Sequence, residues 1–94
     1  MVFSGPRPPE TPVIWQPPHE GFLKANFDVF VAADGSGVGL GVVIRDWRGS
    51  VLVWRHRRVP HIKAPEIGEA LAARCAVQLA RENHYCNMIF EGDS

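Results

Sequence analysis

Acidic side chains at three separated positions are the first feature of this sequence that could do chemistry. Asp28 lies in an alternating stretch, Glu69 in a run of helix-forming residues, and Asp93 just after the apolar run 88–90. Three carboxylates brought together repel one another, and a divalent cation relieves that cost. Carboxylate oxygens are hard ligands that favour Mg²⁺ or Mn²⁺, so we expect a metal site wherever the fold makes these acids converge.

Alternation of apolar and polar residues predicts that Asp28 belongs to a strand over residues 22–32. The odd-numbered apolar residues of this strand share one face, and Asp28 lies on the opposite, polar face. Further strands are predicted over 40–46 and 51–59, the first of them preceded by the glycine-rich turn 33–39. Such short connections predict an antiparallel meander of three strands.

A helix is predicted over residues 65–84, with Pro65 in its first turn, where a missing N–H costs nothing. At about 100° per residue, one side of this helix is apolar. The residues of this apolar arc are Ala72, Cys75, Ala76, Leu79 and Ala80. Glu69 falls within the arc, so we expect its carboxylate on the side of the helix that faces the sheet.

The helix is followed by a fourth short strand, predicted over residues 86–91. A strand–helix–strand passage favours parallel pairing through a right-handed crossover. If this strand pairs with the first, Asp28 and Asp93 both approach the helix that carries Glu69. The predicted fold class is therefore α/β, a mixed sheet of three antiparallel strands and one parallel strand with one main helix.

Composition limits the class of protein. Ninety-four residues make at most one small domain, and a hydrophobic content of 46% is ordinary for a globular chain. Two cysteines do not make a disulfide framework, which favours a reducing compartment. The N-terminus lacks the apolar core of a signal peptide, and no apolar run approaches the roughly 20 residues of a membrane span. We expect a soluble, intracellular protein, of the nucleus or the cytoplasm, with no membrane partner.

The N-terminal segment differs from the rest of the chain. Six of the eight prolines lie within residues 1–21, which predicts an extended tail or linker ahead of a domain over residues 22–94. Trp15, inside this segment, is a candidate to dock on the domain.

Basic residues are concentrated in one part of the chain, although the formal net charge is zero. Arg55, Arg57 and Arg58, next to Trp54, are candidates to follow the phosphates of a nucleic acid. An equally good interpretation is an edge strand that charge protects from pairing with other chains. Alternation places Arg55 and Arg57 on one face and Trp54, His56 and Arg58 on the other, so they cannot all touch one ligand.

Four stretches then resemble a known family in their order along the chain. They are "KANFD" (24–28), "GVGLGVVIRDWRGSVL" (37–52), "EIGEALAARCAVQLA" (66–80) and "IFEGDS" (89–94). This order is similar to that of ribonuclease H type 1 domains, and the closest resemblance is to the plant reverse-transcriptase-like branch, which is related to retrotransposons. That branch often opens with a pattern that is matched here by Trp15, Pro17, Pro18, Gly21, Lys24, Asn26 and Asp28.

The resemblance implies an endonuclease that cleaves the RNA strand of RNA–DNA hybrids and a strand order of 3-2-1-4. In that family two metal ions held by carboxylates activate water and stabilise the leaving oxygen. By resemblance, Asp28 and Asp93 ligate Mg²⁺ or Mn²⁺, and Glu69 ligates a metal and contacts the substrate side. Candidates for contact with the nucleic acid are Asn26, Arg55, Arg57 and Arg58.

The sequence departs from the family pattern at two places. Val29 stands where glycine usually follows the first acid, and the chain ends at Ser94. The family continues with a helix, a fifth strand and a further helix that bears a fourth acid. We therefore expect a truncated domain that lacks the C-terminal part of the fold. The alternatives to an active enzyme are a non-catalytic nucleic-acid-binding module and a transposon-derived relic. Substrate sequence preference, biological role and oligomeric state do not follow from the residues.

Overall fold

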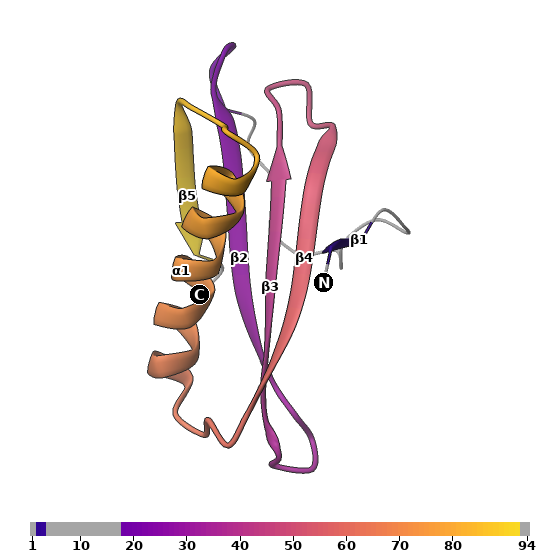
Figure 1. Ribbon diagram of the computed structural model, residues 1–94, viewed down its shortest axis with the longest axis vertical. Helices are drawn as coiled ribbons and strands as arrows, with labels where there is room; N and C mark the ends of the chain where they lie inside the picture. The colour runs from indigo at the N-terminus through magenta and orange to yellow at the C-terminus, as the bar shows by residue number, and fades with distance from the viewer. Residues whose placement is uncertain (1, 4–17, 93–94) are drawn as a thin grey trace.

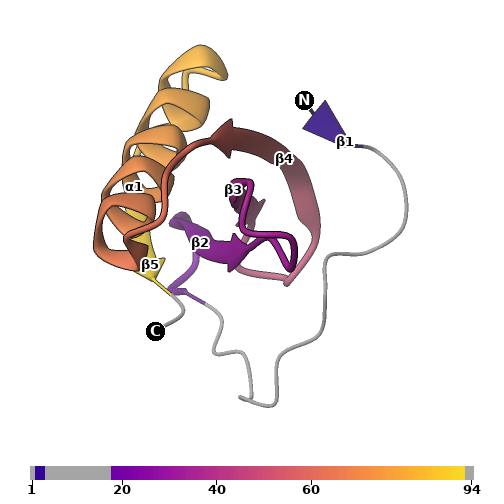
Figure 2. The ribbon, with the colours of Figure 1, turned by 90° about the horizontal axis from the view of Figure 1, so that it is seen from below.

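The computed structural model describes residues 2–3 and 18–92, and in these the chain forms one mixed sheet with one helix packed against it (Figure 1). The elements in chain order are β1 (Val2–Phe3), β2 (Leu23–Val31), β3 (Gly37–Arg45), β4 (Val51–Pro60), α1 (Pro65–Glu82) and β5 (Met88–Gly92). Viewed from below, α1 covers one face of the sheet (Figure 2).

The strands lie side by side in the order β1-β4-β3-β2-β5. β2, β3 and β4 form the antiparallel meander, and β5 pairs parallel to β2. The α/β fold class and the predicted order of the four long strands are therefore confirmed. The sequence does not predict β1, which is only two residues long and hydrogen-bonds to the outer edge of β4. Trp15 lies outside the described residues.

β3 begins at Gly37, three residues earlier than the sequence predicts. Gly37 pairs with Pro60 of β4, and the next residue, Val38, is buried in the core. Glycine was expected in the turn, but at Gly37 it serves close packing, because a Cβ there would overlap the carbonyl oxygen of Val59. The turn itself is tighter, and the Asp34 carboxylate closes it by accepting a hydrogen bond of 2.9 Å from the Ser36 N–H.

The connection from α1 to β5 is also longer than predicted. The helix ends at Glu82, and the fifth strand begins only at Met88. His84 and Asn87 have left-handed backbone φ values of 56° and 53°, which neither a helix nor a strand accommodates. The chain therefore reverses direction between these two residues.

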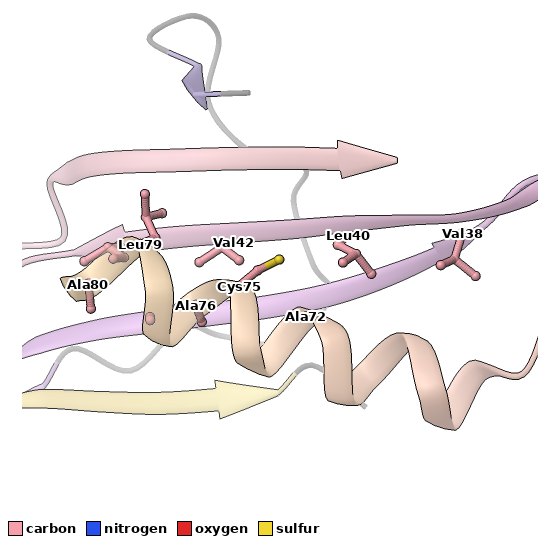
Figure 3. Close-up of a cluster of buried hydrophobic side chains, with 10 residues drawn as sticks. Val38, Leu40, Val42, Ala72, Cys75, Ala76, Leu79 and Ala80 are labelled. Carbon is pink, nitrogen blue, oxygen red and sulfur yellow. The ribbon is translucent and has the colours of Figure 1, made fainter. Parts of the chain in front are cut away.

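The core lies between α1 and the central strands. Each residue of the predicted apolar arc is buried, and these small helix side chains face the aliphatic side chains of β3 (Figure 3). The buried β3 residues are Val38, Leu40, Val42 and Ile44. Because three of the buried helix residues are alanines, the helix backbone lies close to the sheet.

Strand register divides the sheet residues between two faces. The helix face carries Leu40 of β3 and its direct partners Val29 and Arg57, and α1 packs on it. The open face, on which no described helix lies, carries Asp28, Gly41 and His56, which are direct partners across three strands. Residues two apart on one strand share a face, so Asn26, Phe30 and Arg58 also belong to the open face.

Two further observations concern the environment of the chain. Cys75 is buried in the core and Cys86 is exposed, and both are free thiols. Within the described ranges, no helix combines the length and the apolar character that crossing a bilayer requires.

We predict that Leu79→Ala lowers the free energy of unfolding by about 2–5 kcal/mol, because Leu79 is fully buried and its loss leaves a cavity between α1 and β3. Urea unfolding followed by circular dichroism measures this change. Val77→Ala is the matched control on the same helix, and as Val77 is 40% exposed we expect a change below about 0.5 kcal/mol. Equal effects at the two positions would contradict the packing described here.

Candidate active site

Asp28 lies in the middle of β2, on the open face, and is half-buried. Its Oδ1 atom accepts a hydrogen bond of 2.8 Å from the Val29 N–H, which holds the carboxylate close to the strand backbone. The pairing of β2 with β5 ends at Phe27, whose partner is Gly92. Asp28 is thus the first residue of β2 beyond the described end of β5.

β5 ends at Gly92, one residue before Asp93 in the sequence. Asp93 lies outside the described residues. The register of β5 is supported by an ion pair, in which Lys24 Nζ lies 2.9 Å from Glu91 Oε2 and the Lys24 side chain is 9% exposed. Because Gly92 has no side chain, β5 passes close to the Phe27 ring of β2, where a Cβ would lie only 3.1 Å from the ring. The described part of β5 therefore ends level with Phe27, the residue before Asp28.

Glu69 is exposed, which corrects the expectation that it faces the sheet. The ion pair between Arg55 of β4 and Glu82 shows which flank of α1 faces β4. Glu69 lies about 140° around the helix from Glu82, at about 100° per residue, and so on the flank towards β5. Ala76 and Ala80 on that flank are buried, whereas Glu69 lies near the helix N-terminus, beyond the described end of β5.

A close contact between α1 and β2 brings Glu69 near the level of Asp28. Gly68 is buried, and a Cβ at this position would lie 2.8 Å from Cγ1 of Val29. Val29 directly follows Asp28, and Gly68 directly precedes Glu69. The residues adjacent to all three acids are therefore neighbours in space, through the Gly68–Val29 contact and the Phe27–Gly92 pairing.

The donor set suits a divalent cation in its chemistry. Carboxylate oxygens are the ligands that Mg²⁺ and Mn²⁺ prefer, and Asp28 and Glu69 offer them from a strand edge and a helix end. In residues 2–3 and 18–92, no three side chains of His, Cys, Asp or Glu gather closely enough to hold a metal, and Asp93 falls outside this range. The assignment of the three acids as metal ligands therefore stays a prediction.

The four candidates for nucleic-acid contact divide between the two faces, and the predicted separation of Arg55 and Arg57 from Arg58 is confirmed by the strand register. Asn26 and Arg58 share the open face with Asp28. Arg58 Nη2 donates a hydrogen bond of 2.6 Å to Ser36 Oγ.

The two remaining arginines lie on the helix face. Arg57 is exposed, whereas Arg55 binds Glu82 through contacts of 2.5 Å and 3.4 Å between guanidinium nitrogens and carboxylate oxygens. The hydrogen bond from Arg55 lowers the pKa of the Glu82 carboxyl. Arg55 therefore connects β4 to the C-terminal turn of α1.

Sequence reasoning missed the residues that hold the site together. The predicted apolar arc does not include Gly68, although a glycine among strong helix formers is itself a signal of close packing. The partners of Lys24 and Arg55 could not be found from spacing, since each pair joins segments far apart in the chain.

Comparison with known proteins adds the family. A family model described as reverse transcriptase-like matches residues 26–94. The match includes Asp28, Glu69 and Asp93 and most of the described fold. Searches of curated proteins and of solved structures gave no significant match.

We predict that Glu82→Gln lowers the stability slightly at pH 7 and not in acid. Arg55 lowers the pKa of Glu82 below its ordinary value of 4.5, so the pair stabilises the fold above that value, and this contribution is lost as the pH falls through the folded-state pKa. Because the Glu82 side chain is 55% exposed, solvent screens the pair and the effect is small.

Urea unfolding of the native chain and the variant from pH 7 to pH 3 measures this difference. Arg55→Gln is the matched change in the partner. If the two side chains interact, the double variant should lose no more unfolding free energy than the two single variants lose in sum. A difference between the native chain and Glu82→Gln that persists unchanged at pH 3 would rule out the ion pair as its cause.

Proposed function

Because the chain belongs to the reverse transcriptase-like family and has a ribonuclease H-like fold, we propose that it is a metal-dependent endonuclease that cleaves the RNA strand of RNA–DNA hybrids. Asp28, Glu69 and Asp93 are the proposed ligands of Mg²⁺ or Mn²⁺. The observation that supports this proposal best is the convergence of their neighbouring residues, through the Gly68–Val29 contact and the Phe27–Gly92 pairing.

In this mechanism, the residues of the chain position the metal and the substrate. Divalent ions bound there would activate a water molecule and stabilise the leaving oxygen. The Val29 N–H holds Asp28 through its Oδ1 atom, which fixes the carboxylate close to the strand backbone. Glu69 lies exposed near the N-terminus of α1.

The open face is the proposed contact surface for the nucleic acid. Asn26 and Arg58 lie on the same face as Asp28, and an arginine there can contact a phosphate near the scissile bond. Arg55 is engaged with Glu82 on the helix face, so we assign it to the fold rather than to the substrate.

A second candidate function is nucleic-acid binding without cleavage. Val29 favours it, because a branched side chain follows the first acid where the resembled family usually has glycine.

The pattern of Trp15, Pro17 and Pro18 with Lys24, Asn26 and Asp28 supports assignment to the plant, retrotransposon-related branch of type 1 domains.

The first experiment is cleavage of a labelled RNA–DNA hybrid by the 94-residue chain with Mg²⁺ or Mn²⁺. We expect cleavage of the RNA strand only, loss of activity with a chelator, and a decrease of about a hundredfold or more in Asp28→Asn and Glu69→Gln. A metal ligand supplies several kcal/mol to the transition state, and each 1.4 kcal/mol is tenfold in rate.

Glu66→Gln is the matched control for Glu69→Gln, because Glu66 is an exposed glutamate in the first turn of the same helix. It should retain activity. Hybrid binding without cleavage by the folded native chain would favour the second candidate function, and neither binding nor cleavage would reject both.

We predict that Arg58→Gln weakens hybrid binding and that Arg57→Gln does not. Each phosphate contact that is lost lowers the slope of log affinity against log salt by about one. Only Arg58 shares a face with Asp28, whereas Arg57 lies on the helix face of the same strand. Fluorescence anisotropy over a salt series with a chelator present measures both slopes, and a lower slope in Arg57→Gln alone would place the substrate on the opposite face.

A further inference from the structure

Gly68 of α1 packs against Val29 of β2 at the level of the candidate site. A Cβ built on Gly68 would lie 2.8 Å and 3.6 Å from the two Cγ atoms of Val29, and 3.7 Å from Cγ2 of Val38. The first distance is shorter than real Cβ contacts. The helix backbone therefore rests directly on the Val29 side chain, and no larger residue fits at position 68 without movement.

Each member of this pair is bonded covalently to a proposed metal ligand. Asp28 precedes Val29 on β2, and Glu69 follows Gly68 on α1. The distance between the α1 and β2 backbones at this contact sets the separation of the Asp28 and Glu69 Cα atoms, from which the two carboxylates extend. Asp28 has little freedom to compensate, because the Val29 N–H holds its Oδ1 atom at 2.8 Å.

From this contact we infer that Gly68 and Val29 are a matched pair of positioning residues, which sets the Asp28–Glu69 separation to suit a divalent cation. The inference rests on the proposed function, since it assumes that both acids bind metal. It gives the valine at position 29 a role, as the side chain on which α1 rests, and it explains a glycine within an otherwise strongly helix-forming sequence.

Gly68→Ala tests the pair in one direction. Ordinary contact begins at 3.4 Å and the new Cβ would lie at 2.8 Å, so the helix and strand must separate by about 0.6 Å or Val29 must shift. Supporting residues behind a metal site typically contribute about 10–100-fold to affinity, so we expect Mn²⁺ binding, measured by calorimetry or electron paramagnetic resonance, to weaken about tenfold.

The double variant Val29→Ala/Gly68→Ala separates positioning from a general loss of structure. Removing the Val29 methyl groups makes room for the Cβ introduced at position 68, so Mn²⁺ affinity should return to within about threefold of the native value, a non-additive result that only a direct contact explains. Ala70→Gly is the matched control for helix propensity, because Ala70 is exposed. It should lower the melting temperature and leave Mn²⁺ affinity unchanged.

Equal Mn²⁺ affinity in the native chain and in Gly68→Ala would overturn the inference while leaving the proposed function intact. If the native chain itself binds no Mn²⁺, the proposed function fails, and crystal structures of the native, single and double variants decide the inference separately. A Cα–Cα separation between Asp28 and Glu69 that increases by about half an ångström in Gly68→Ala and returns in the double variant would support the positioning role. An unchanged separation would reject it.

Discussion

Close packing of α1 on the sheet is the constraint on which the rest of the structure depends. The buried side of the helix carries glycine, alanine, cysteine and only one large residue, Leu79. Small side chains let the two backbones approach, and the aliphatic residues of β3 fill the remaining space. A helix held at this distance returns the chain beside β2, where β5 pairs in parallel.

The same constraint positions the acids. At the N-terminal end of the helix, Gly68 packs against Val29, and at the end of β5 Gly92 passes beside Phe27. A Cβ at Gly68 would force a shift and one at Gly92 would crowd the Phe27 ring, and the residue that follows each glycine is a proposed metal ligand. The geometry of the candidate site therefore follows from backbone proximity more than from hydrogen bonds between the acids themselves.

Two ion pairs connect the ends of this arrangement. Arg55 and Glu82 join β4 to the C-terminal turn of α1, and Lys24 and Glu91 join β2 to β5. The two pairs lie on opposite faces of the sheet, as the strand register shows. Basic residues of β4 consequently divide in their roles, since Arg55 stabilises the helix contact and Arg58 remains on the face of Asp28.

The sequence by itself determined the helix and the four long strands. Alternation predicted β2, the apolar arc predicted the buried side of α1, and the crossover predicted parallel pairing of β5, because these patterns depend on local periodicity. Only the tertiary structure decided that Glu69 is exposed, that Gly37 belongs to a strand and that Gly68 rests on Val29. These features depend on distances between segments far apart in the chain, and neither residue type nor spacing encodes such distances directly.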